Sequence, residues 1–256
     1  MTLMVALVGD QTLPNFLPIR HYKPDNVLLV YTTRTESKYK QLKSALQQET
    51  TIFGLDLKSN SHETEAITKT LKDMFETEEL ASQKAEFNLT GGTKPMSLAA
   101  YQIAQQYEAP VFYLESEGKH SRVYHYTWEN QQLKAASNEL LPECATLKDL
   151  FNLHFGIGNW QETGVGRKEG SPFEAALANA LQAHGYEVMI GVNAMGQIDI
   201  DVAMRYENQF GIIEAKMGKN GSKLDGIKQL NNVLRHLGTY TQPFYAINGK
   251  WCASVA

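Results

Sequence analysis

The first half of the chain alternates short apolar runs with amphipathic stretches, and this alternation most constrains the fold. Apolar runs of strand length lie at residues 3–9, 27–31, 52–57, 86–90 and 111–115. Stretches with apolar residues at helical spacing, such as 37–48 and 62–80, lie between several of them. Strands separated by helices are joined by right-handed crossovers, which give a mainly parallel sheet. The sequence therefore predicts a Rossmann-like α/β domain over residues 1–130.

The second half has a different order of elements. A helix pattern over 171–184 precedes three strand patterns, and a second helix pattern precedes a last strand. A short turn at 207–209 joins the second and third of these strands, which predicts an antiparallel hairpin. We therefore predict a second α/β domain over 171–256. Residues 131–170 are polar or rich in glycine and predict a connector with one short helix.

Length and composition are those of an ordinary globular protein. The 256 residues, 43% of them hydrophobic, are enough for two domains that each bury a core. No run approaches the roughly 18 apolar residues of a membrane helix. The apolar N-terminal run lacks the basic region and cleavage site of a secretory signal. We therefore expect a cytoplasmic protein.

Three acids and a lysine form the clearest chemical pattern. Side chains alternate along a strand, so Asp199 and Asp201 share one face, and Glu214 and Lys216 share a face of the paired strand. Two carboxylates, Asp199 and Glu214, can hold Mg²⁺ or Mn²⁺, which prefer oxygen ligands. Lys216 can orient a water or neutralise a phosphate. Glu174, on the preceding helix, is a fourth candidate.

Each of these residues also has a purely structural interpretation. Glu174 follows Ser171 by three residues, as in a helix capping box. Asp201 fits a solvated strand position, and Glu214 with Lys216 fits a surface ion pair. The functional interpretation depends on the combination of the acids with the hairpin and the preceding helix.

Basic residues follow this cluster in the sequence. Lys216, Lys219, Lys223, Lys228 and Arg235 fall within twenty residues. Such a stripe predicts a nucleic-acid-binding face, even though the net charge of the chain is −4. A solvated helix face is the alternative.

Two polar loops of the first half follow apolar strands. The second loop contains two adjacent glycines and opens a helix, where backbone N–H groups and the helix dipole attract an anion. Walker A and dinucleotide-binding glycine patterns are both absent from the sequence. A structural tight turn is the alternative for the second loop. The candidate ligand residues are Asp10, Gln11, Thr12 and Asn15 in the first loop, and Thr90, Gly91, Gly92, Thr93 and Lys94 in the second.

The second half resembles the PD-(D/E)xK nuclease superfamily, which is also called restriction-endonuclease-like. The resemblance covers residues 171–249, although Gln197-Ile198-Asp199 replaces the usual Pro-Asp. It implies that Asp199 and Glu214 bind a divalent metal and that Lys216 is the catalytic lysine. It further implies an accessory acid at Glu174 and a supporting polar residue at Gln229.

The first half resembles the CARF domain, the CRISPR-associated Rossmann-like sensor of cyclic oligoadenylate, through segments 6–12, 30–33 and 88–94. The whole chain resembles CARF nucleases of type III CRISPR antiviral defence, although it is short for that family. This resemblance implies a homodimer that binds cyclic tetra-adenylate across its twofold axis and then closes its nuclease domains on DNA or RNA. It adds Thr33 to the candidate cyclic-nucleotide-binding residues.

Three other functions remain open from the sequence. In the first alternative, the first half of the chain itself degrades the cyclic nucleotide, as a ring nuclease. The chain can instead be a regulator that binds a cyclic nucleotide and nucleic acid without catalysis. A restriction or repair nuclease whose first half reads DNA is the third alternative.

Overall fold

Two compact units form the computed structural model, Met1–Cys144 and Ala145–Ala256. The structure describes residues 1–58, 62–77, 80, 82–117, 120–164, 171–218 and 224–249. Within those ranges, no helix has both the length and the apolar character needed to cross a membrane.

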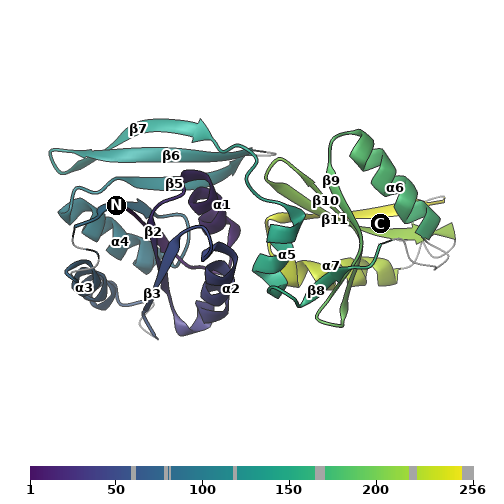
Figure 1. The fold of residues 1–256 in the computed structure, drawn as a ribbon, viewed down its shortest axis with the longest axis horizontal. Helices are drawn as coiled ribbons and strands as arrows, with labels where there is room; N and C mark the ends of the chain where they lie inside the picture. Colours follow the sequence, from purple (N-terminus) through teal and green to yellow (C-terminus); the bar gives the residue numbers. More distant parts are fainter. Residues whose placement is uncertain are drawn as a thin grey trace. The chain divides into compact units, whose positions relative to one another are not determined.

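A seven-stranded sheet organises the first unit, in the order β3-β2-β1-β4-β5-β6-β7 (Figure 1). Strands β1 to β5 run parallel, as their helical crossovers predict, and β6 and β7 are antiparallel at one edge. This confirms a Rossmann-like α/β fold. The strands are β1 (Thr2–Leu7), β2 (Asn26–Tyr31), β3 (Thr51–Asp56), β4 (Lys84–Asn88), β5 (Val111–Glu117), β6 (His120–Glu129) and β7 (Gln132–Leu140).

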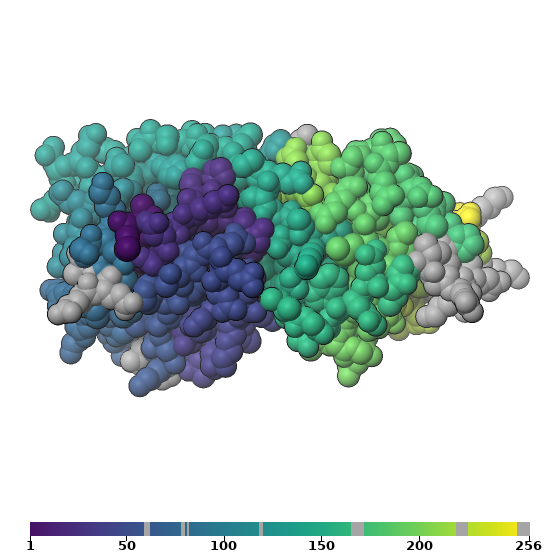
Figure 2. Space-filling model, in the orientation of Figure 1, coloured from purple at the N-terminus to yellow at the C-terminus, as the bar shows by residue number. Residues whose placement is uncertain are grey.

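Helices cover both faces of this sheet. Leu3, Val5 and Leu7 of β1 share a buried core with α3 and α4, while α1 and α2 lie on the opposite face (Figure 1). The N-terminal residue Met1 is exposed, and the N-terminal segment lies on the visible surface of its unit (Figure 2). The helices are α1 (Leu13–Tyr22), the 3-10 turn η1 (Thr33–Thr35), α2 (Glu36–Leu46), α3 (Thr64–Phe75) and α4 (Lys94–Gln106).

Two elements of the first unit differ from the sequence prediction. Helix α1 includes Pro14 and Asn15, where we predicted a loop. A proline is compatible with the first helical turn because its missing N–H has no partner there in any case. Strand β7 falls in the predicted connector, yet it pairs with β6 along its length. The first unit therefore extends beyond residue 130.

A five-stranded sheet organises the second unit, in the order β12-β11-β10-β9-β8. Strand β12 is parallel to β11, and the other neighbours are antiparallel, including the predicted β10–β11 hairpin. The short helix predicted in the connector, α5, belongs to this unit, and so does strand β8, which was not predicted. The elements are α5 (Leu147–Phe155), β8 (Trp160–Glu162), α6 (Ser171–Ala183), β9 (Glu187–Ala194), β10 (Ile198–Tyr206), β11 (Gln209–Met217), α7 (Leu224–Leu237) and β12 (Thr241–Asn248).

Two helices contribute apolar side chains to the core of the second unit. Val202 of β10 and Ile213 of β11 pack with Leu177 of α6. Val233 and Leu237 of α7 are also buried. Burial of these apolar side chains holds β10 and β11 in place, and the polar cluster described below lies on these two strands.

Candidate functional site

The loops that follow β1 and β4 approach each other closely at the carboxyl edge of the first sheet. A Cβ on Gly91 would lie 2.0 Å from the carbonyl oxygen of Leu7, and one on Gly9 would lie 3.0 Å from the amide nitrogen of Gly92. Gly92 also has φ of +73°, which favours glycine. The glycine pair therefore brings the two loops together at the edge where α/β sheets usually bind ligands.

Two fully buried asparagines join these loops. The side-chain amide of Asn15 donates to Leu7 O at 2.8 Å. The amide of Asn88 donates to Pro14 O at 2.9 Å and to Asn15 Oδ1 at 3.1 Å. Asn88 Oδ1 accepts a hydrogen bond from Thr90 N at 3.0 Å. Asn15 is thus part of the framework beneath the edge, whereas the sequence predicted it on the ligand-binding surface.

The other predicted ligand residues divide into framework and surface. Thr12 is buried. Thr90 Oγ1 accepts a hydrogen bond from Leu114 N at 2.8 Å, and Thr93 caps α4 by accepting from Met96 N at 3.4 Å. The surface set comprises the exposed Asp10, Thr33 and Lys94, together with the half-buried Gln11, Gly91 and Gly92.

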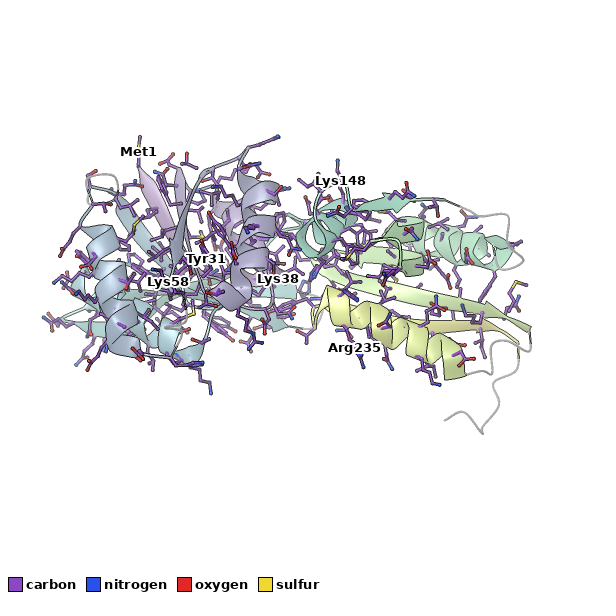
Figure 3. All side chains as sticks on the ribbon, turned by 90° about the horizontal axis from the view of Figure 1, so that it is seen from below. Met1, Tyr31, Lys38, Lys58, Lys148 and Arg235 are labelled. Atoms are coloured by element: carbon purple, nitrogen blue, oxygen red, sulfur yellow. The ribbon has the colours of Figure 1, made fainter. Side chains whose placement is uncertain are left out.

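Asp10 lies between two basic side chains that the sequence analysis did not select. Arg34 Nη2 lies 2.8 Å from Asp10 Oδ2, and both side chains are largely exposed. Burial lowers the pKa of Lys38 in α2, and the Asp10 carboxylate partly offsets this shift. Figure 3 labels Lys38 together with Tyr31 and Lys58 of the same unit. Arg34 lies three residues after the end of strand β2, and this position was the available sequence signal because it places Arg34 at the same carboxyl edge.

In the second unit, the buried Glu214 and the half-buried Lys216 form an ion pair on β11. The Lys216 ammonium contacts the Glu214 carboxylate, which is only 2% exposed. Burial raises the pKa of Glu214 to about 7, although pairing with Lys216 opposes the rise. Burial lowers the pKa of Lys216, but pairing with Glu214 outweighs this effect and raises it. A carboxyl group near its titration midpoint therefore lies beside a charged lysine at neutral pH.

Asp201 completes this cluster at the point where strands β10 and β11 stop pairing. The last pair of the ladder is Val202 with Ile213. One residue beyond it, Asp201 Oδ2 accepts a hydrogen bond from Ala215 N at 2.8 Å and lies 3.7 Å from Lys216 Nζ. The Asp201 carboxylate thus satisfies a backbone N–H that β10 no longer reaches, and it adds a second acid beside the lysine.

Asp199 has a different environment. Its side chain is exposed, and Asp199 Oδ1 accepts a hydrogen bond from Asn193 Nδ2 at 2.8 Å. The structure therefore places Asp201 beside Lys216, where the sequence analysis selected Asp199 and left Asp201 as a solvated residue. Alternation alone does not distinguish two aspartates on the same strand face. The distinguishing feature is the end of the β10–β11 ladder.

Glu174 of α6 lies within electrostatic range of this cluster. Its charge is among the influences that raise the pKa of Glu214, although it is the smallest of them. The structure therefore agrees with the prediction that helix α6 contributes an acid, Glu174, near the Glu214–Lys216 pair.

Tyr245 of β12 is a neighbour of the cluster that the sequence analysis missed. It lies opposite Glu214 in the parallel β11–β12 ladder. Burial raises the pKa of Tyr245, and the charges of Lys216 and Glu214 also act on it. A Cβ on Gly226 of α7 would lie 2.6 Å from its ring. A glycine in the first turn of α7 thus allows the ring to approach the helix.

Two carboxylates of the cluster fit a hard divalent cation. Glu214 and Asp201 offer oxygen ligands of the type that Mg²⁺ and Mn²⁺ prefer. Apart from its pairing with Lys216, the buried Glu214 Oε1 has no bonding partner among the described residues. Among the residues that the structure describes, no group of three or more aspartate, glutamate, histidine or cysteine side chains is arranged to hold a metal ion. A cation here would thus take its remaining ligands from water or substrate.

The predicted nucleic-acid-binding residues are only partly described. Lys228 of α7 is exposed, with its ammonium 3.9 Å from Asp225 Oδ1, and Gln229 beside it is also exposed. Lys219 and Lys223 lie outside the described residues. Lys228 and Gln229 are therefore accessible to a ligand.

Comparison with known families identifies the first unit. The family described as the Card1 CARF domain matches residues 3–141, which is more than half of the chain. A search of curated proteins found no match.

Solved structures resemble the chain over nearly its whole length. Can2 from Sulfobacillus thermosulfidooxidans, in complex with cyclic tetra-adenylate, aligns with a TM-score of 0.76 and 15% identity, covering 100% of this chain and 92% of Can2. Protein VC1899 from Vibrio cholerae aligns with a TM-score of 0.72 and 13% identity, covering 99% of this chain and 90% of VC1899. A type III CRISPR defence DNA nuclease activated by cyclic oligoadenylate aligns with a TM-score of 0.72 and 18% identity, covering 98% of this chain and 47% of that protein. At these identities the likeness establishes the fold alone.

Proposed function

Because the chain belongs to the Card1 CARF domain family, we propose that it is a type III CRISPR defence nuclease activated by a cyclic oligoadenylate. The first unit senses the activator, and the second unit hydrolyses phosphodiester bonds of DNA or RNA. The fold likeness to Can2 and to a cyclic-oligoadenylate-activated DNA nuclease supports this combination. The observation that carries the catalytic half is the contact of Lys216 with both Glu214 and Asp201.

The activator binds at the carboxyl edge of the first sheet in this proposal. Backbone N–H groups at Gly91 and Gly92 and the cations Lys94 and Arg34 suit phosphates, whereas Thr33 suits a hydroxyl or base. A cyclic tetra-adenylate has repeated, symmetric phosphates, which match a pocket built by two copies of this edge. The active species is therefore a homodimer, and the activator acts by favouring one arrangement of its subunits.

The residues of the second unit divide the chemistry of hydrolysis. A water oxygen bonds to phosphorus, the bond to the leaving sugar oxygen breaks, and the proton of the water passes to the leaving oxygen or to solvent. A divalent ion held by Glu214 and Asp201 would activate the water and polarise the phosphate. Lys216 offsets the negative charge of the transition state, and the acids beside it hold its ammonium in place.

The test is cleavage of a plasmid, a single-stranded oligonucleotide and an RNA, each with Mn²⁺ or Mg²⁺ and with or without cyclic tetra-adenylate. We expect cutting that needs both metal and activator. Lys216→Ala removes the cutting but leaves activator binding intact, since the two sites are in different units. Lys148→Ala, an exposed lysine on α5 labelled in Figure 3, serves as the matched control.

One observation favours a second function: Lys216 and Glu214 are in direct contact with each other. An ion pair that buries one partner can serve structure alone, in which case the chain is a cyclic-nucleotide-responsive regulator without catalysis. In that case, metal neither binds nor supports cutting, and Lys216→Ala lowers only thermal stability. Loss of the intact activator during incubation would instead indicate a ring nuclease.

A further inference from the structure

A polar groove of about 410 Å³ lies beside the β9–β10 hairpin of the second unit. We call it the amide groove. Residues 158–161 line one side, and Asn193, Met195 and Gly196 line the other. Its volume lies within the range of small-ligand sites in proteins, roughly 300–1,000 Å³.

The walls of the amide groove are held by a hydrogen bond between two lining residues and by contacts with residues outside the groove. Asn159 O accepts a hydrogen bond from Met195 N at 2.9 Å, which ties the two sides together. Trp160 Nε1 donates to Asn152 Oδ1 at 2.9 Å, and the Trp160 ring lies 5.1 Å from the ring of Phe151. The groove is therefore formed before any ligand arrives, and binding there orders few additional side chains.

The chemistry of the lining selects the kind of ligand. None of the lining residues in the described part of the chain is ionisable, so these residues offer no cation to a phosphate. Asn159, Gln161 and Asn193 carry primary amides, and amides that both donate and accept hydrogen bonds recognise base edges. Trp160 and Met195 add flat or polarizable apolar surfaces, of the kind on which bases stack. A neutral, planar, hydrogen-bonding ligand such as a nucleobase fits all of these features.

A hydrogen bond and a short stretch of strand β10 connect the amide groove to the Asp201–Lys216 cluster. Asn193 donates a hydrogen bond to Asp199, and Asp199 precedes Asp201 by two residues. Two residues of a strand span about 7 Å. Asp201 in turn contacts Lys216. A nucleic-acid strand with its phosphate at Lys216 therefore has a neighbouring base within reach of the groove.

We propose that the amide groove binds one unpaired nucleobase of the nucleic-acid strand, beside the scissile phosphodiester. A base in a duplex has its Watson–Crick edge occupied and its faces stacked, whereas a single strand presents both. The placement of this base beside the cut phosphodiester rests on the proposed function. Binding of an unpaired base in the groove is independent of that function, because it requires no hydrolysis.

The first experiment measures binding without cutting. Fluorescence anisotropy in EDTA, with cyclic tetra-adenylate present, compares a 12-mer single strand with an otherwise identical strand whose bases are replaced by abasic spacers. The two strands have equal phosphate charge, so their difference reports bases alone. We expect the intact strand to bind at least about fivefold more tightly, the lower end of what one stacked base contributes.

A double variant locates this preference in the groove. Gln161→Ala with Met195→Ala removes two exposed lining side chains, and we expect it to bind both strands equally. Gln242→Ala, on an exposed position of β12 outside the groove, is the matched control and keeps the wild-type preference. An undiminished preference in the double variant, or no preference in the wild-type protein, overturns the proposal.

The second experiment separates this inference from the proposed function. If metal-dependent cutting occurs, single strands are cut faster than duplexes, and one abasic spacer beside the cut slows the wild-type protein but not the double variant. Equal cutting of both forms, insensitive to the spacer, would overturn the groove while leaving the nuclease proposal standing. Base-dependent binding with no cutting under any condition would overturn the nuclease proposal while leaving the base-binding groove standing.

Discussion

The ammonium of Lys216 lies 3.7 Å from the carboxylate of Asp201, the aspartate that extends beyond the last β10–β11 pair. This contact distinguishes Asp201 from Asp199, two residues earlier, whose carboxylate is hydrogen-bonded to Asn193.

We predict that Asp201→Asn lowers the proposed metal-dependent cutting by roughly 100-fold, because it removes a proposed cation ligand and a charge beside Lys216. Asp199→Asn serves as the matched control, with the same chemical change two residues away, and is expected to cost less than about tenfold. The measurement is kcat/KM on one substrate at saturating activator. A larger loss at Asp199 than at Asp201 would contradict the assignment.

The buried Glu214 predicts a pH dependence of stability in the metal-free protein. Its folded pKa of about 7 exceeds the unfolded value of 4.5. Between these values the folded protein keeps a proton that the unfolded chain has released. The contribution of Glu214 to the free energy of unfolding is therefore full below about pH 4.5 and decreases as pH rises to about 7, by up to roughly 3 kcal/mol.

Urea unfolding in EDTA at several pH values measures this slope. Glu214→Gln should flatten it because glutamine does not titrate, and the difference between the two proteins isolates Glu214 from other titrating groups. Parallel stability curves for the two proteins between pH 5 and 7 would show that Glu214 is not the source.

The Asp10–Arg34 pair predicts opposite effects on activator binding. Arg34→Ala should weaken cyclic tetra-adenylate binding about tenfold or more, because a charge-assisted bond to phosphate contributes roughly 1.5–3 kcal/mol. Asp10→Asn should leave the affinity unchanged or raise it, because it removes a carboxylate that competes with phosphate for Arg34. Titration calorimetry measures both effects.

Lys40→Ala provides the control for net charge in this experiment, since that lysine is an exposed residue of α2 paired with Glu36. If Lys40→Ala weakens activator binding as much as Arg34→Ala, the effect is general electrostatics and not a direct contact.

Gly91→Ala is predicted to destabilise the first unit strongly. The added Cβ would lie 2.0 Å from the carbonyl oxygen of Leu7, and a backbone atom has little freedom to move. We expect a loss on the order of 3 kcal/mol or more, measured as a lower Tm. Gly249→Ala is the control and should change Tm little, since the nearest atom among the described residues is 3.6 Å away. Equal Tm values for the two variants would show that the β1 and β4 loops are not in close contact.

Regular patterns made most of the fold predictable, and the missed elements lack those patterns. Strand β7 is exposed at nearly every position, so it has no buried face to produce an apolar alternation. Helix α1 contains Pro14 and Pro18, and seven consecutive residues from Leu13 to Ile19 are buried, so it has neither a helical composition nor an amphipathic stripe.

The candidate sites were predictable only to the level of the loop or strand. Glu214 and Lys216 were located because two residues on one strand necessarily share a face. The choice between Asp199 and Asp201 depended on where a ladder ends, which alternation does not encode. Asn15 resembled a ligand residue because a buried amide that bonds to backbone and an exposed amide that bonds to a ligand have the same sequence signature.

The hydrogen bonds made by the side chains of Asn15 and Asn88 restrict how the proposed sensor can diverge. They anchor the first turn of α1 to the end of β4, so neither loop can shift alone without leaving a buried amide unsatisfied. If the first unit binds the activator as proposed, we expect adaptation to a different ring size to be confined to the side chains above this anchor, at Asp10, Gln11, Thr33, Arg34 and Lys94. A library randomised at those five positions should retain folded members far more often than one randomised at the two asparagines.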